Sequence, residues 1–201
     1  MSRIGILGGT FDPVHTAHLM IAEGAADEFS LDRVLLMPTG ISPHKEEKNL
    51  TPVSDRLAMI ELAVSDNPRL IPSRFETDSK EVSYTFRTAE RMSTQFPGDT
   101  FYYIMGADSL RMFAKWKNPE IIARHFHLVA AVRDDADEEC LYTLAEEYAS
   151  LFDAKVSLLH VPNFSISSTD IRERIRNGRS VRYLTPDPVI NYIKEHHLYE
   201  D

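Results

Sequence analysis

The sequence of 201 residues has almost no cysteine and no long apolar run. Its single cysteine, Cys140, cannot form a disulfide within the chain, which favours a reducing compartment. No apolar stretch approaches the roughly 20 residues of a membrane-spanning helix, and the first residues do not resemble a secretory leader. These absences predict a cytoplasmic protein that does not enter a membrane.

Basic residues are also in the minority, because the formal net charge is −9. A protein that binds the backbone of DNA or RNA normally presents a basic face, so we expect no nucleic-acid partner. Small anionic ligands remain compatible with this charge, since a local cluster of cations can oppose the net sign. Internal repeats and Gly/Ser-rich linkers are missing too, and 43% apolar residues suffice for a core. We therefore predict one domain over residues 1–201.

Short apolar runs alternate with amphipathic stretches along the chain. The runs predict strands at residues 3–7, 33–37, 70–72, 100–105, 127–132 and 156–161. The stretches predict helices at residues 17–29, 54–66, 84–96, 119–125, 136–152, 168–177 and 186–196. This alternation predicts an α/β fold with a doubly wound, Rossmann-like parallel sheet, helices on both faces and two C-terminal helices. In such sheets ligands bind at the carboxyl ends of the strands, so the residues that follow each strand are the candidates.

The first predicted strand is followed by a glycine turn and two histidines. The segment reads Gly8-Gly9-Thr10-Phe11-Asp12-Pro13-Val14-His15-Thr16-Ala17-His18. Glycines allow close approach to a ligand, and the N-terminus of the next helix suits phosphate. His15 and His18 are three residues apart, so they can face the same side. The pattern favours a phosphate site over the alternative of a plain turn with two partly buried histidines, and it fits neither G-x-G-x-x-G nor a P-loop.

This segment resembles the first signature of the nucleotidyltransferase superfamily, except that Ala17 stands where the family usually has glycine. The residues Ile166-Ser167-Ser168-Thr169-Asp170-Ile171-Arg172 resemble its second signature, although Ser167 and Asp170 also fit the capping of a helix. The resemblance implies that His15, His18 and Arg172 act on the phosphates of ATP as catalytic residues. It implies an ATP site made of Gly8, Gly9, Thr10, Phe11, His15, His18, Ile166, Ser167, Ser168, Thr169 and Arg172.

Three further segments are similar to the bacterial-type nicotinate-mononucleotide adenylyltransferases. They are Pro43-His44-Lys45, Ser83-Tyr84-Thr85, and Gly106-Ala107-Asp108-Ser109-Leu110 followed by Trp116. The similarity implies that Trp116 stacks on the pyridine ring and that backbone N–H groups of Thr85 and Lys117 hold its carboxylate. It implies a substrate site made of His44, Lys45, Ser83, Tyr84, Thr85, Gly106, Asp108, Trp116, Lys117 and Arg133.

Each of these segments also has a purely structural interpretation. His44 and Lys45 could belong to a solvated loop, and Ser83-Tyr84-Thr85 could cap a helix. Asp108 could be the N-cap of a helix at residues 109–113. Trp116, the only tryptophan, could be ordinary core packing.

The resemblance implies adenylyl transfer from ATP to nicotinate mononucleotide, which gives deamido-NAD and pyrophosphate as a step of NAD biosynthesis. The attacking phosphate is already an anion, so positioning and charge stabilisation suffice without a general base. We expect Mg²⁺ to arrive with ATP and to keep mostly water ligands, without a metal site built by the protein.

Three other functions stay open at this point. One is a related transferase that acts on phosphopantetheine or phosphoglycerol, and another is a nucleotide-sensing module without catalysis. A redox dinucleotide-binding domain fits least, because the glycine spacing is wrong. The preference for the acid over the amide of the pyridine nucleotide is open, as is the presence of a homo-oligomer.

Overall fold

A six-stranded parallel sheet forms the centre of the molecule, in the order β3-β2-β1-β4-β5-β6. The computed structural model describes residues 1–41, 50–79, 81–132, 138–162 and 165–200. The strands are β1 (Arg3–Gly9), β2 (Arg33–Pro38), β3 (Leu70–Pro72), β4 (Thr100–Gly106), β5 (Phe126–Val132) and β6 (Val156–His160). The direction of winding reverses between β1 and β4, which is the point where sheets of this kind bind ligands.

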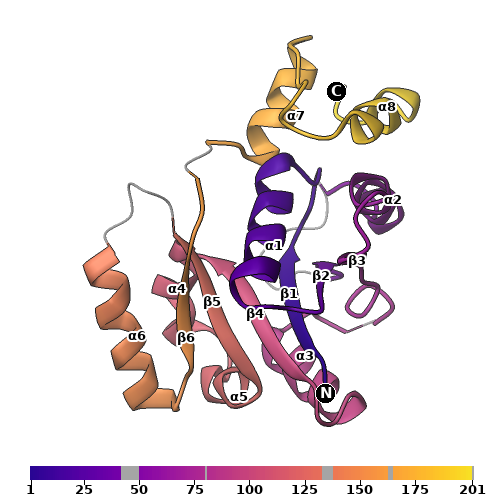
Figure 1. Cartoon of the computed structure of the whole chain (residues 1–201). Helices are drawn as coiled ribbons and strands as arrows, with labels where there is room; N and C mark the ends of the chain where they lie inside the picture. Colours follow the sequence, from indigo (N-terminus) through magenta and orange to yellow (C-terminus); the bar gives the residue numbers. More distant parts are fainter. Residues whose placement is uncertain (42–49, 80, 133–137, 163–164, 201) are drawn as a thin grey trace.

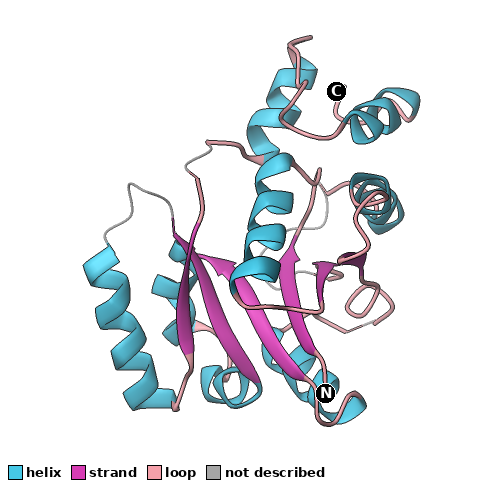
Figure 2. Cartoon of the chain, viewed as in Figure 1, coloured by secondary structure: helices cyan, strands magenta, loops and turns pink. Residues whose placement is uncertain are grey.

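Helices cover both faces of this sheet (Figures 1 and 2). They are α1 (Thr16–Glu28), α2 (Val53–Ala63), α3 (Thr85–Gln95), α4 (Ala107–Met112), the 3-10 helix η2 (Phe113–Lys115), α5 (Pro119–His125), α6 (Glu138–Phe152), α7 (Ser168–Arg176) and α8 (Asp187–Glu195). Residues of α1, α2 and α8 share one apolar core, and residues of α3 to α6 share the other. The prediction of a doubly wound α/β sheet is confirmed.

The central strands are apolar along their length because both of their faces are covered. Strand β5 has the sequence FHLVAAV and buries every residue except His127, which is partly exposed. An antiparallel sheet with one wet face would instead alternate apolar and polar residues. The continuous apolar runs in the sequence therefore predicted the covered parallel sheet correctly.

The two C-terminal helices lie beyond the carboxyl ends of the strands, at the top of the view in Figure 1. Ile171 of α7 and Ile190 of α8 form a small core with Val181. Val189 and Ile193 on α8 join the larger core beside α1 and α2. These helices are thus packed next to the end of the sheet where ligands are expected.

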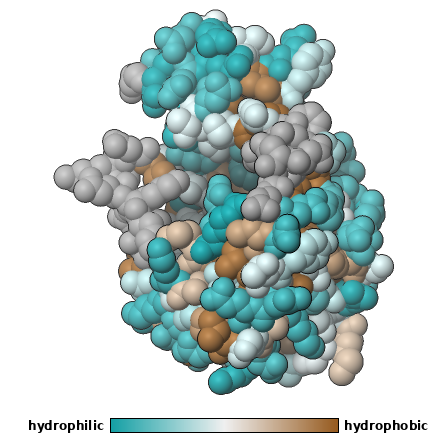
Figure 3. Space-filling model, turned by 90° about the vertical axis from the view of Figure 1, so that its left-hand side faces the viewer, coloured by the Kyte–Doolittle hydropathy of each residue, from teal (hydrophilic) through white to brown (hydrophobic). Residues whose placement is uncertain are grey.

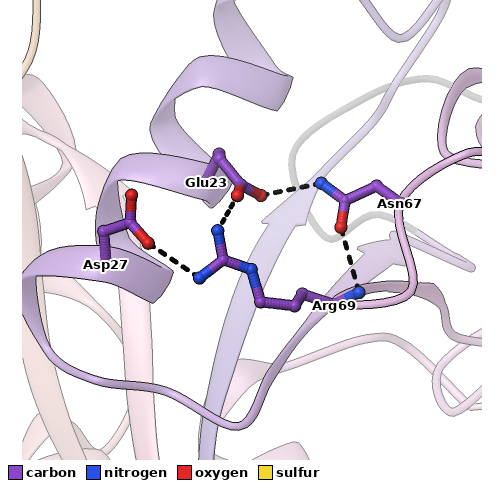
Figure 4. A network of polar contacts seen from close by, with 4 residues as sticks. All are labelled: Glu23, Asp27, Asn67 and Arg69. Atoms are coloured by element: carbon purple, nitrogen blue, oxygen red, sulfur yellow. Dashed lines mark hydrogen bonds and ion pairs between the residues drawn. The ribbon is translucent and has the colours of Figure 1, made fainter.

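Helix α1 is tied to the segment before β3 by a polar network (Figure 4). Arg69 donates to Glu23 and, over 2.7 Å, to Asp27, and the Asn67 amide donates to Glu23 over 2.8 Å. Exposed ion pairs contribute little free energy individually, but a network fixes geometry better than one pair. This network involves the middle and C-terminal part of α1, and the N-terminus of α1 takes no part in it.

The surface drawn in Figure 3 is mostly hydrophilic, with hydrophobic residues in small separate groups. Within the part of the chain that the structure describes, no helix combines the length and apolar character needed to span a bilayer.

Candidate functional site

The loop between β1 and α1 (residues 10–15, the β1–α1 loop) turns sharply at the carboxyl end of β1. Phe11 has a φ of 51° and a relative exposure of 1%. A Cβ on Gly9 would lie 3.3 Å from that ring, so glycine gives the ring room to fold back under the loop. The ring meets His18 edge-on, with centroids 4.8 Å apart.

His15 and His18 lie together at the N-terminus of α1, as the spacing predicted. Their rings stack with centroids 3.6 Å apart, and the backbone N–H of His15 donates to Nδ1 of His18 over 3.2 Å. Burial and the neighbouring His15 hold the pKa of His18 well below its usual value, so its ring is neutral at pH 7. Because Nδ1 accepts a hydrogen bond, the proton of the neutral ring is on Nε2. His18 therefore offers one N–H donor.

The segment that begins α7 meets the β1–α1 loop, although they are about 160 residues apart in sequence. Oγ of Ser168 donates to the Pro13 carbonyl over 2.9 Å, and Nη1 of Arg172 donates to the Asp12 carbonyl over 2.6 Å. Ser167 is the N-cap of α7 and accepts from the backbone N–H of Asp170 over 3.1 Å, so the capping interpretation is confirmed. The two predicted signatures form one surface.

A cavity of about 640 Å³ opens beside this surface. It is lined by Thr39, Ser83, Tyr84, Thr85, Ser109, Met112, Lys115, Trp116, Lys117 and Ile122. Both the backbone N–H and the hydroxyl of Thr39 donate to the Gly9 carbonyl, over 2.8 and 3.2 Å. Thr39 therefore joins the cavity directly to the end of β1. The structure thus brings together five of the predicted substrate-site residues: Ser83, Tyr84, Thr85, Trp116 and Lys117.

Aromatic rings and cations both line this cavity. Trp116 contacts Phe113 and Tyr103, with ring centroids 5.8 and 6.1 Å away, and Nζ of Lys117 lies 4.6 Å from the Tyr84 ring centroid. Lys115 adds a second cation to the lining. Flat rings and positive charge together suit a planar, anionic ligand. Tyr84 occupies the N-cap position of α3 without a side-chain capping bond, so the capping interpretation of this segment is not supported.

Two titratable groups lie behind the cavity and were not identified from the sequence. Burial and the nearby Glu76 carboxylate raise the pKa of Tyr103 to about 12. Burial also raises the pKa of Glu76, which accepts a hydrogen bond from the Thr88 hydroxyl over 2.8 Å. The Tyr103 hydroxyl would lie 2.9 Å from a Cβ on Gly8, so it sits directly under the end of β1. A tyrosine inside an apolar strand carries no sequence signal for this position.

Gly106 and Asp108 do not line the cavity. Helix α4 begins at Ala107 with Gly106 as its N-cap, so the expected start at residue 109 and the N-cap role of Asp108 are both wrong. The Asp108 side chain is fully exposed and pairs with Arg111 over 3.1 Å. His44, Lys45 and Arg133 lie outside the described residues. Among the residues that are described, no group of three His, Cys, Asp or Glu side chains is placed to hold a metal ion.

A buried arginine supports the whole region and was also missed. Arg56 of α2 has a relative exposure of 2%. Its Nη1 donates to the Thr10 and Thr39 carbonyls over 2.8 and 3.0 Å, and its Nε donates to the Thr51 carbonyl over 3.0 Å. Arginine within an amphipathic helix normally lies on the wet side, so nothing in the sequence distinguishes Arg56.

Comparison with known proteins gives consistent results over the whole chain. The sequence profile of the cytidylyltransferase-like family matches residues 6–174. A probable nicotinate-nucleotide adenylyltransferase of Lachnoclostridium phytofermentans is 39% identical over 199 residues, which cover 99% of this chain and 100% of that protein. One of Desulfitobacterium hafniense is 41% identical over 198 residues, covering 98% and 95% of the two chains. The Plasmodium falciparum nicotinic acid mononucleotide adenylyltransferase complexed with NaAD has the same fold, with a TM-score of 0.81, 20% identity, and 100% and 98% of the two chains covered.

Proposed function

The chain belongs to the cytidylyltransferase-like family, and we propose from this that it transfers the adenylyl group of ATP to nicotinate mononucleotide. The products are deamido-NAD and pyrophosphate, and the reaction is a step of NAD biosynthesis. The enzyme is a nicotinate-nucleotide adenylyltransferase, like its relatives that are about 40% identical over nearly the full length.

The contact between the two distant signatures, beside a cavity, carries this proposal. Ser168 and Arg172 bond to the β1–α1 loop, and Thr39 joins the cavity to Gly9 at the end of β1, where that loop begins. Adenylyl transfer needs a phosphate site and an acceptor site side by side, so that the two phosphates meet in line.

The ATP site is the surface shared by the β1–α1 loop and the start of α7. The Nε2–H group of His18 donates to a phosphate oxygen, and His15, Ser168 and Arg172 stand around the same position. The N-termini of α1 and α7 add their positive dipole ends, although the N–H groups of Thr16 and His18 in α1 already donate to the Leu184 and His15 carbonyls. Gly8, Gly9, Thr10, Phe11, Ile166, Ser167 and Thr169 complete the proposed site.

The acceptor site is the cavity lined by Trp116 and Lys117. The pyridine ring stacks on Trp116, and the N–H groups of Thr85 and Lys117 hold its carboxylate. Ser83 and Tyr84 form the adjoining wall. Gly106 and Asp108, which do not line the cavity, stay proposed substrate contacts outside it. His44, Lys45 and Arg133, which lie outside the described residues, also stay proposed.

In the reaction, a phosphate oxygen of nicotinate mononucleotide attacks the α-phosphorus of ATP. A new P–O bond forms, the bond to the bridging oxygen of the β-phosphate breaks, and pyrophosphate leaves. The attacking oxygen is already ionised, so the residues of the ATP site hold the phosphates in line and stabilise the charge that develops. ATP would be used as its magnesium complex: the nucleotide rather than a carboxylate cage of the protein would hold the ion, which would supply charge neutralisation at the phosphates beside His15, His18 and Arg172.

The net charge of −9 supports small anionic substrates held by local cations, without a nucleic-acid partner. The single cysteine supports a cytoplasmic location. A homo-oligomer is compatible with this scheme, because both proposed sites are built within one chain.

Pyrophosphate release from MgATP tests the function, with nicotinate mononucleotide, nicotinamide mononucleotide and phosphopantetheine assayed in parallel. We expect rapid release with the nicotinate compound and slower release with the amide. If pyrophosphate were released only when phosphopantetheine is the acceptor, the chain would be a transferase that acts on phosphopantetheine. No release with any of the three acceptors would favour a nucleotide sensor.

A further inference from the structure

The last residues of the chain return to the β1–α1 loop. The hydroxyl of Tyr199 donates to Oδ1 of Asp12 over 2.6 Å, across 187 residues of sequence. Asp12 has a relative exposure of only 2%. A buried carboxylate needs hydrogen-bond donors to offset the loss of its hydration, so the Tyr199 hydroxyl stabilises the buried Asp12 side chain.

Asp12 is the residue on which several segments converge. Its Oδ2 accepts from the backbone N–H of Thr51 over 3.4 Å, and its carbonyl accepts from Nη1 of Arg172 over 2.6 Å. Its neighbour Pro13 accepts from Ser168 over 2.9 Å. The position of Asp12 therefore sets the path of the β1–α1 loop three residues before His15.

Tyr199 is held in place by the rest of the C-terminal segment. The backbone N–H of Leu198 donates to the Ile193 carbonyl over 3.0 Å, and both Leu198 and Tyr199 pack against the larger core. Tyr199 has a φ of 66°, an unfavourable conformation for a residue with a side chain, which persists only where surrounding contacts fix it. Burial and the Asp12 carboxylate raise the pKa of Tyr199, so its phenol stays protonated and remains a donor.

We propose that Tyr199 is a positioning residue of the ATP site: it fixes Asp12, and through Asp12 the β1–α1 loop that carries His15 and His18. The residue does not touch the substrates. This inference rests on the proposed function, because it assigns ATP to that loop. Loss of the phenol hydroxyl removes the donor that the described residues provide to Oδ1 of this buried carboxylate, so Asp12 and the loop shift.

The chain provides a matched control at a second tyrosine near the C-terminus, Tyr192 of α8. The hydroxyl of Tyr192 donates to Oδ1 of Asp55 over 2.9 Å, and Tyr192 also packs against the larger core. This contact ties α8 to the start of α2 and does not involve the β1–α1 loop. Tyr199→Phe and Tyr192→Phe thus each remove one tyrosine–aspartate hydrogen bond and keep the ring.

The two variants and the unchanged enzyme are compared in three measurements: steady-state kinetics, the Kd of ATP by calorimetry, and the thermal midpoint. We expect Tyr199→Phe to lower kcat/KM for ATP about tenfold and to weaken ATP binding, with KM for nicotinate mononucleotide unchanged. Tyr192→Phe should lower the thermal midpoint by less, because Asp55 is only partly buried, and it should leave kcat/KM and Kd for ATP within twofold.

The inference would be overturned if the two variants had the same kcat/KM and the same Kd for ATP. A Tyr199→Phe protein that does not fold would overturn it as well, because the contact would then serve the whole fold. If the enzyme without substitutions released no pyrophosphate, only the proposed function would be contradicted. The Kd of ATP for the two variants would still decide the role of Tyr199.

Discussion

At the level of single residues, the pair of His15 and His18 shows how a short motif acquires defined chemistry. The stacked rings are 3.6 Å apart, and the hydrogen bond from the backbone of His15 fixes the tautomer of His18. A neutral ring is easier to bury than a cation, and its Nε2–H group remains a donor for phosphate.

Replacing His18 by alanine tests this donor. We expect His18→Ala to lower kcat by about 10²–10³-fold, the range found when one preorganised donor to a transition state is lost. His125→Ala is the control, because His125 ends α5 at the opposite end of the sheet. Steady-state kinetics and circular dichroism would check the pair, and near-normal turnover of His18→Ala with an intact fold would exclude the role.

The lowered pKa of His18 also predicts how stability depends on pH. In the unfolded chain His18 titrates near pH 6.5, and in the folded chain it titrates at lower pH. Acidification below about pH 6.5 therefore protonates the unfolded state first and favours unfolding, with a slope of at most about 1.4 kcal/mol per pH unit from this residue. The stability that the neutral His18 ring contributes is fully present above about pH 6.5.

Urea unfolding of the ligand-free protein at pH 7.5 and pH 5.5 measures this effect. The unchanged protein should lose more stability on acidification than His18→Gln, whose side chain does not titrate. Parallel losses in the two proteins would show that His18 does not contribute to the acid sensitivity.

Lys117 predicts a preference for the acid substrate over the amide. Lys117 lines the cavity, its Nζ lies 4.6 Å from the Tyr84 ring centroid, and we expect this charge to attract the carboxylate of nicotinate mononucleotide. We expect Lys117→Met to raise KM for this substrate about three- to tenfold, because one exposed charge contributes up to roughly 1 kcal/mol. KM for nicotinamide mononucleotide should stay the same, and equal changes for both substrates would contradict the charge effect.

At the level of elements, two glycines have opposite predicted effects. Gly24 lies within α1, where an added Cβ would meet only Leu159, at 4.0 Å, among the residues that the structure describes, so Gly24→Ala should stabilise the fold by about 0.5–1 kcal/mol. Gly40 follows Thr39, and its Cβ would lie 2.7 Å from the Glu76 carbonyl oxygen. Gly40→Ala should therefore destabilise by about 1–3 kcal/mol and raise KM for the pyridine substrate.

Urea unfolding and steady-state kinetics of both alanine variants check these effects. A stable Gly40→Ala protein with unchanged KM would mean that the segment after β2 adjusts without disturbing the cavity.

The elements were predictable because their apolar patterns are local. All six strands and the long helices follow from runs of sequence, and the glycine turn and Ser167 mark two helix starts correctly. The start of α4 was misplaced because a cap depends on backbone geometry, and Asp108 and Gly106 are both acceptable at that position. Predictions at His44, Lys45 and Arg133 stay predictions, as they fall outside the described residues.

At the level of the whole molecule, the sequence could not predict what long-range contacts decide. Arg56 looks like a surface residue of an amphipathic helix, yet it is buried under three carbonyl groups. Tyr199 reaches Asp12 from the other end of the chain. Such contacts have no periodicity that a sequence pattern could show. The one domain over residues 1–201 also stays a prediction.

The fate of the α-phosphate tests the central claim most directly. ATP labelled at its α-phosphorus is incubated with Mg²⁺, nicotinate mononucleotide and the protein, and the products are separated and identified by mass. The proposed chemistry predicts that the label appears in deamido-NAD in equal amount to unlabelled pyrophosphate. Label that stays in ATP, or that appears in AMP or ADP without the dinucleotide, would contradict adenylyl transfer to the pyridine nucleotide.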